Sequence, residues 1–227
     1  MKNYPFVVFV IFFYSISFGQ NVSFNPEKDF LDFEENLKTK IITPTYRIQV
    51  ENKEIRFEDF FISFSELDDS LKIYINNDTL NIYKLITQNI VEFEKQQVDY
   101  ANSLLEVNYY QELNILMFLV HFYPCTGLGC GVNYQIMYHT GSKKMFAFGR
   151  FRIGFDMELY DYNDDKLYYL SKSFNGRNIQ GIDKIKYELF PIDFKLNELH
   201  PLKETFAEIV TDENENRIVS FKEHWIE

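Results

Sequence analysis

Apolar residues recur along the chain with two different spacings, and the first of these indicates a helix. Phe30, Phe33 and Leu37 are three or four positions apart and are separated by charged residues, as on the buried face of an amphipathic helix. Pro26 precedes this face, and proline is favoured at the first position of a helix. We therefore predict a helix over residues 26–38.

From residue 45 onward the spacing changes to two, and alternation of apolar and polar residues is typical of half-buried strands. Turn-forming residues separate the alternating segments. The pattern predicts hairpins of 46–50 with 55–57, 71–75 with 80–85, 131–138 with 144–153, 157–159 with 167–170 and 206–210 with 218–221, and further strands at 105–109 and 182–190. Pro191 marks the end of the 182–190 segment as an edge or a bulge, because proline has no N–H for a ladder.

The run from Leu113 to Tyr123 is almost wholly apolar, which is typical of a central strand covered on both faces. The other strands are short, and turn signals recur roughly every ten residues along the chain. This arrangement predicts a mainly β fold, an antiparallel meander or sandwich-like sheet with one short helix at its N-terminal end.

The first 19 residues have the layout of a secretory signal peptide. Lys2 supplies the positive start, Phe6–Phe13 the apolar core, and Ser17 and Gly19 the small residues before the cleavage point. A membrane anchor is the alternative, but the block is shorter than the roughly 20 apolar residues of a spanning helix. We expect residues 1–19 to be removed.

Cleavage would leave residues 20–227 as a single β-rich globular domain, exported to the periplasm, the cell surface or the extracellular space, with no stable membrane span. The chain has 24 Phe and 16 Tyr among its 227 residues, and aromatic side chains fit the half-buried surface of a sheet. Its net charge of −11 disfavours nucleic acid, whose phosphates need Lys and Arg. Among charged partners, a basic protein or a cation is favoured.

Cys125 and Cys130 flank a short glycine-containing loop, and two cysteines in an exported chain indicate a disulfide. So small a ring would stabilise the fold by only about 2 kcal/mol. Two alternatives remain. His121 and His139 complete the ligand set of a zinc site. A redox-active pair is disfavoured, because the spacing exceeds that of Cys-x-x-Cys and no basic residue adjoins either sulfur.

An acidic segment resembles the start of a calcium-binding loop. Asp161, Asn163 and Asp165 occupy alternate positions, as the first three ligands of such a loop do. However, Lys166 and Lys172 stand where the loop requires Gly and Glu. We therefore favour a hairpin turn with solvated acids, since Asp and Asn are common in turns.

Two arginines share one face of a predicted strand. If the chain reverses at Gly154, Arg152 faces Asp156 and Arg150 faces Glu158, and opposite charges across an antiparallel pair stabilise it. The alternative is that Arg150 and Arg152 together bind a carboxylate or a phosphate.

Catalytic signatures are missing from the sequence. It contains neither a Gly-x-Ser-x-Gly elbow nor a glycine-rich phosphate loop. We therefore assign no catalytic residue and no cofactor, and we predict a non-enzymatic binding or interaction protein whose ligand is a basic protein or a glycan. The alternative is a carboxylate-dependent hydrolase, assisted by calcium. That enzyme would need a deep cleft in which two acids converge and one has a raised pKa.

Overall fold

A computed structural model describes residues 26–67, 70–82, 101–122, 132–151, 157–162, 166–211 and 217–221. It confirms the mainly β fold: these residues form three antiparallel sheets, and the α-helix described in full is α1 (Pro26–Lys38). The helix-side sheet has the order β1 (Ile41–Ile42), β11 (Leu159–Tyr162), β12 (Lys166–Arg177), β13 (Asp183–Pro191), β14 (Lys203–Thr211), β15 (Arg217–Phe221). The central sheet has the order β10 (Lys144–Phe151), β9 (Val132–His139), β8 (Ile115–Phe122), β7 (Ala101–Tyr110), β2 (Tyr46–Gln49). The outer sheet has the order β3 (Glu54–Phe57), β4 (Phe60–Leu67), β5 (Ser70–Ile75), β6 (Asp78–Asn81).

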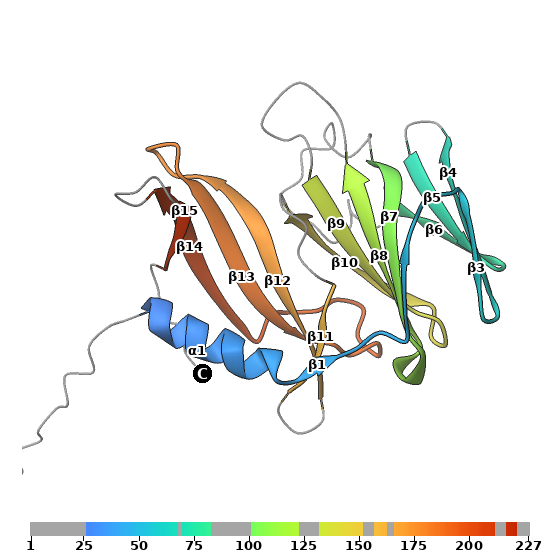
Figure 1. Cartoon of the computed structure of the whole chain (residues 1–227), viewed down its shortest axis with the longest axis horizontal. Coiled ribbons are helices and arrows are strands. Elements are labelled where there is room, and N and C mark those ends of the chain that lie inside the picture. The colour runs from blue at the N-terminus through green and yellow to red at the C-terminus, as the bar shows by residue number, and fades with distance from the viewer. Residues whose placement is uncertain are drawn as a thin grey trace, which may run out of the picture.

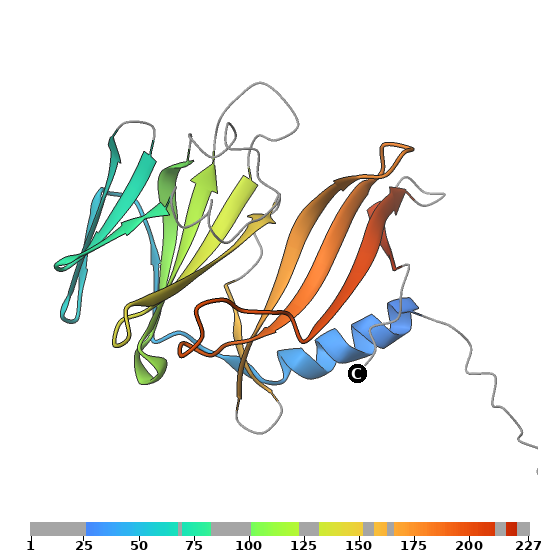
Figure 2. The same cartoon turned by 180° about the vertical axis from the view of Figure 1, so that it is seen from behind.

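The helix and the three sheets form four successive layers, in the order α1, helix-side sheet, central sheet and outer sheet (Figure 1). The view from behind shows the same order (Figure 2). A separate apolar cluster fills each of the three interfaces between neighbouring layers. The central sheet is therefore buried on both faces. This confirms the prediction for β8, whose Phe118 packs towards the outer sheet and whose Met117 packs towards the helix-side sheet.

Helix α1 has the predicted bounds, and its apolar face is buried against the helix-side sheet. Phe30 and Leu37 are almost fully buried there. The Phe30 ring lies 4.5 Å from the ring of Tyr187 on β13. Glu34 accepts a hydrogen bond from Lys172 of β12, so an ion pair joins the same two layers.

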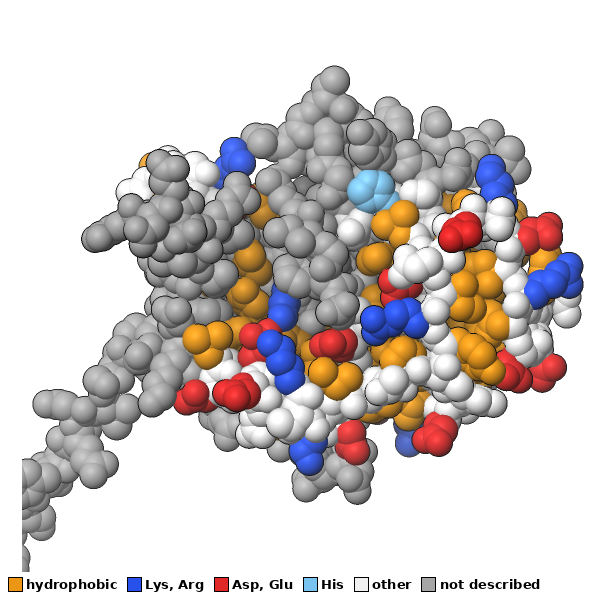
Figure 3. Space-filling model, viewed as in Figure 1, with side chains coloured by type: hydrophobic (Ala, Val, Ile, Leu, Met, Phe, Trp, Pro, Cys, Tyr) orange, Lys and Arg blue, Asp and Glu red, His pale blue; other side chains and the backbone are white. Residues whose placement is uncertain are grey.

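The predicted hairpin of 46–50 with 55–57 is wrong, although both segments are strands. β2 pairs with β7 in the central sheet, whereas β3 pairs with β4 in the outer sheet, so the chain crosses between layers after β2. Aromatic packing across the layers connects these strands instead. The Tyr46 ring lies 5.5 Å from Phe57 and 6.4 Å from Tyr109. Figure 3 shows hydrophobic side chains gathered over the outer sheet and its junction with the central sheet.

The hairpin predicted to reverse at Gly154 is also wrong, because β10 belongs to the central sheet and β11 to the helix-side sheet. Arg150 therefore does not face Glu158 across a shared ladder. Glu158 instead accepts a hydrogen bond of 2.7 Å from the hydroxyl of Tyr160.

The remaining predicted hairpins are confirmed: β5 with β6, β9 with β10, β11 with β12, and β14 with β15. Pro191 pairs with Tyr168 on one side of β13, while the ladder with β14 ends at Leu189. The position of Pro191 is thus a local edge, as predicted. β4 was not anticipated from the sequence, because its Phe61 faces outward beneath the Arg56 guanidinium and obscures the alternation.

Gly149 on β10 lies against the ring of Tyr134 on the paired strand β9. The two residues are Cα partners, and Tyr134 is fully buried. A Cβ atom on Gly149 would stand 2.1 Å from a ring carbon of Tyr134, which is far inside van der Waals contact. Only glycine fits this position while the ring keeps its place.

Candidate functional site

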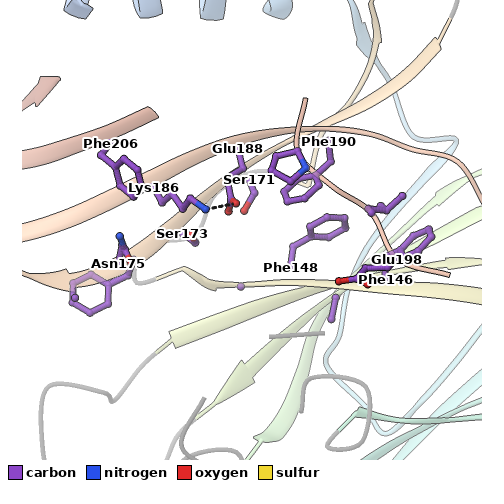
Figure 4. Close-up of a pocket in the computed structure, with 16 residues that line it drawn as sticks. Phe146, Phe148, Ser171, Ser173, Asn175, Lys186, Glu188, Phe190, Glu198 and Phe206 are labelled. Carbon is purple, nitrogen blue, oxygen red and sulfur yellow. Dashed lines mark hydrogen bonds and ion pairs between the residues drawn. The ribbon is translucent and has the colours of Figure 1, made fainter. Parts of the chain in front are cut away.

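A pocket of about 580 Å³ lies where β10 of the central sheet faces β12, β13 and β14 of the helix-side sheet (Figure 4). Its volume is within the range of pockets that hold small organic ligands. The segment between β13 and β14 contributes its rim, through Glu198, Leu199 and Pro201. The pocket therefore combines two layers of the fold and one connection.

Alternation along the strands determines which side chains reach the floor of the pocket. Leu170 on β12 and Tyr187 on β13 point to the helix, where they join its apolar cluster. Their neighbours in sequence point the other way. Ser171, Ser173, Lys186 and Glu188 therefore line the pocket, which gives it a polar floor on the back of an apolar interface.

Phenylalanine rings form much of the pocket wall. Phe148 of β10 lies 5.4 Å from Phe190 of β13 in an edge-to-face arrangement, and 4.2 Å from Tyr169 beneath it. Phe206 lies at the other end of the floor, with the Lys186 Nζ 5.7 Å from its ring centroid. These contacts hold the rings in place before any ligand arrives.

Two charged side chains of the floor, Lys186 and Glu188, form a network with Glu204 of the neighbouring strand. Glu188 and Glu204 are directly opposed on β13 and β14, an arrangement that is unfavourable for two like charges. The ammonium of Lys186 resolves it by donating to Glu188 Oε1 at 2.6 Å and to Glu204 Oε2 at 2.9 Å. Burial alone would lower the pKa of Lys186, but the two carboxylates outweigh it and the pKa is raised. Lys186 therefore remains charged.

Several polar side chains of the pocket have hydrogen-bonding capacity to spare. Ser171 is only 2% exposed, yet among the described residues its hydroxyl has no hydrogen-bond partner. Within the same part of the structure, Ser173 and Asn175 also make no side-chain hydrogen bond. The Ser171 hydroxyl is not enclosed, because it is not among the fully buried side-chain atoms that lack a partner in the described structure, and Ser173 and Asn175 are partly exposed. All three groups are therefore open to a ligand in the pocket.

A second pocket, of about 520 Å³, lies between β11 and the turn η2 (Gln111–Leu113) that joins β7 to β8. Asp161 of the predicted acidic segment lies here, exposed, with Glu112 and Lys166. The other two calcium candidates, Asn163 and Asp165, lie outside the described residues. In the part of the chain that the structure describes, no three metal-binding side chains come together.

The two histidines of the zinc hypothesis lie at opposite ends of β8 and β9. His121 pairs with Asn133, whereas His139 pairs with Ile115, six residues away along β8, or about 20 Å. They therefore do not share one metal site. The Nδ1 atom of His121 lies 2.6 Å from Asn133 Oδ1, and Nδ1 of His139 accepts a hydrogen bond from the Ser142 N–H.

Other predicted features lie outside the described residues: the leader 1–19, Cys125, Cys130 and Arg152. Arg150 is part of β10, but its side chain is not described. No described helix combines the length and the apolar character needed to cross a bilayer. The disulfide, the leader and the arginine pair therefore stay predictions.

The floor residues were not identified from the sequence. Their one signal is the alternation in β12, where Ser171, Ser173 and Asn175 follow one another at every second position. A polar face of that kind also suits an ordinary solvated strand, so it does not by itself indicate a site.

Comparison with known proteins found no family model, no curated relative and no solved structure that resembles this chain.

Proposed function

We propose that this protein is a binding protein that holds a small polar organic ligand in the pocket between β10 and β12–β14. The observation that carries the proposal is the row of Ser171, Ser173 and Asn175 in the lining of the pocket, whose side chains make no hydrogen bond to any described residue. Phe148 on the facing strand β10 and Phe190 beside Glu188 on β13 supply apolar surface next to these polar groups. Apolar walls with a few placed polar groups are typical of ligand pockets.

Hydrolysis by paired carboxylates receives less support from the same geometry. Such enzymes need one protonated carboxyl group as the general acid. Glu188 and Glu204 each accept a hydrogen bond from the Lys186 ammonium, so the two carboxyl groups face a cation that holds them in place. A lysine nucleophile would need a lowered pKa, so that role is disfavoured too.

The expectation of export belongs to this proposal, because it follows from the leader-like residues 1–19. The pocket also favours one of the two predicted partner classes. A volume of about 580 Å³ suits one or two sugar units of a glycan. The surface of a basic protein would instead need a broad, shallow interface.

Filling the pocket should abolish ligand binding. In Ser173→Trp the indole would occupy space on the floor, and we expect affinity for polar fragments to fall at least about tenfold. The matched control is Ser63→Trp on β4, a partly exposed serine that does not line the pocket. Saturation-transfer NMR with a mixture of small polar fragments would measure both. Equal binding by the two variants, or no binding by the unmodified protein, would contradict the proposal.

A further inference from the structure

We propose that the ligand of this pocket is an uncharged saccharide, and that Lys186 and Glu188 recognise two neighbouring hydroxyl groups on it; this inference rests on the proposed binding function. The ammonium of Lys186 has three N–H donors, and two of them are used by Glu188 and Glu204. Among the described residues, neither the third donor nor the second oxygen of Glu188 has a partner.

A donor and an acceptor thus stand side by side on the floor, and both carry a charge. A hydroxyl group both donates and accepts, so two adjacent hydroxyls can accept from Lys186 and donate to Glu188 at the same time. Hydrogen bonds to ionised partners are stronger than those between neutral groups. In Figure 4 the Lys186 side chain runs along the floor to Glu188, with Ser171 beside them.

The serines of β12 extend this polar row. Ser171 and Ser173 point to the same face of their strand, on the order of 7 Å apart. This spacing allows them to reach two different hydroxyls around one six-membered sugar ring. Ser171 is the Cα partner of Glu188, and Ser173 is the Cα partner of Lys186, so each serine lies beside one member of the charged pair.

The charge of the network argues against an ionic ligand. One lysine stands between two glutamates, and Glu198 adds a further acid at the rim, so an anion would be repelled. A cation that approached the unpartnered oxygen of Glu188 would lie close to the Lys186 ammonium, which carries the same charge. An uncharged ligand with many hydroxyls avoids both costs, and its C–H faces can pack on Phe148 and Phe206.

Binding of monosaccharides to the full protein tests this inference. Titrations would use D-glucose, D-galactose, D-mannose and N-acetylglucosamine, followed by the monodeoxy forms of whichever sugar binds. We expect removal of one hydroxyl to weaken binding to the unmodified protein about tenfold. In Lys186→Met, the intact sugar should bind about tenfold more weakly, and the same deoxy sugar should lose little more.

Lys184→Met is the matched control, because Lys184 is on the same strand and its Nζ also lies 5.7 Å from the Phe206 ring, but it does not line the pocket. It should bind as the unmodified protein does. If Lys186→Met does not fold, Glu188→Gln carries the same test. Equal losses in the lysine variants at 184 and 186 would overturn the assignment.

The two proposals can fail separately. If polar fragments bind in a manner that Ser173→Trp blocks, but no monosaccharide binds, the saccharide inference is overturned and the binding function stands. If no fragment binds, both are overturned. A linear oligomer of the bound sugar shows whether the natural ligand is a free sugar or the end of a glycan chain. Tighter binding of the oligomer indicates the glycan chain, and equal binding indicates the free sugar. Either result supports saccharide recognition.

Discussion

The protein should unfold in a cooperative transition between about pH 11 and pH 12. The reason is that its buried tyrosines resist ionisation in the folded state. Burial raises the pKa of Tyr187 to about 12. Burial likewise raises the pKa of Tyr110, Tyr160 and Tyr169 well above the usual value. All four side chains are at most 6% exposed. A tyrosinate at any of these positions would be a charge without water.

The direction in which stability changes with pH follows from proton binding. Unfolded tyrosines lose their protons near pH 10, whereas the folded ones keep them to higher pH. The folded state therefore binds more protons in this interval, and its stability is complete below about pH 10 and falls as the pH rises. Each such tyrosine removes about 1.4 kcal/mol per pH unit. Four together remove about 5.5 kcal/mol per pH unit, comparable with the whole stability of a domain.

Lys186 acts in the same direction, since its raised pKa contributes stability that is lost as the pH rises through that value. Absorbance at the tyrosinate band and far-UV circular dichroism, recorded in one alkaline titration, would measure the transition. Tyr187→Phe is the control: it removes one titrating hydroxyl and should make the pH dependence shallower by about one proton. Full ionisation of all tyrosines near pH 10 with an unchanged dichroism spectrum would show the burial argument to be mistaken.

Gly149→Ala should be the most disruptive single substitution among the described glycines. The new methyl group would stand 2.1 Å from one carbon of the Tyr134 ring and 3.2 Å from its Cγ, close to the point where the ring joins the chain. The ring is buried between the central and outer sheets and has no room to withdraw. We expect a loss of about 3 kcal/mol in the free energy of unfolding, measured by urea denaturation.

Gly176→Ala is the comparison, because it isolates backbone strain from steric overlap. Gly176 has a φ of +77°, and no atom would come within 4 Å of the added Cβ. Gly176→Ala should lower the free energy of unfolding by about 1 kcal/mol. In the background of Tyr134→Leu, which removes the ring, Gly149→Ala should cost far less. An undiminished cost in that background would argue against the ring as the cause.

The positions of strands could be predicted from the sequence, but their partners could not. The alternation of Ile48 and Ile55 with polar residues correctly identified β2 and β3, and a nearby turn suggested that they pair with each other. Periodicity reports only which side of a strand is buried. It does not distinguish a ladder within one sheet from packing between two, and here the four-layer stack selected the second.

The site was harder to anticipate than the fold, because it belongs to no single segment. Phe148 and Glu188 are forty residues apart in the sequence and belong to different sheets, and they meet only because two layers stack. The residues singled out from local patterns, such as His121 and His139, lie apart once the register is known. A site formed by residues from two stacked sheets therefore cannot be recognised from the spacing of residues within one segment.

The burial of helix α1 has a consequence for the biogenesis of this protein. Phe30, Phe33 and Leu37 are covered by side chains of β11, β12 and β13 and by Ala207 of β14, all of which the ribosome makes more than 120 residues later. The strands of the outer and central sheets all precede β11, so they are complete while the helix still lacks its cover. The nascent chain thus exposes these three apolar side chains for most of its synthesis, and exposed apolar surface promotes aggregation until the last third of the chain emerges.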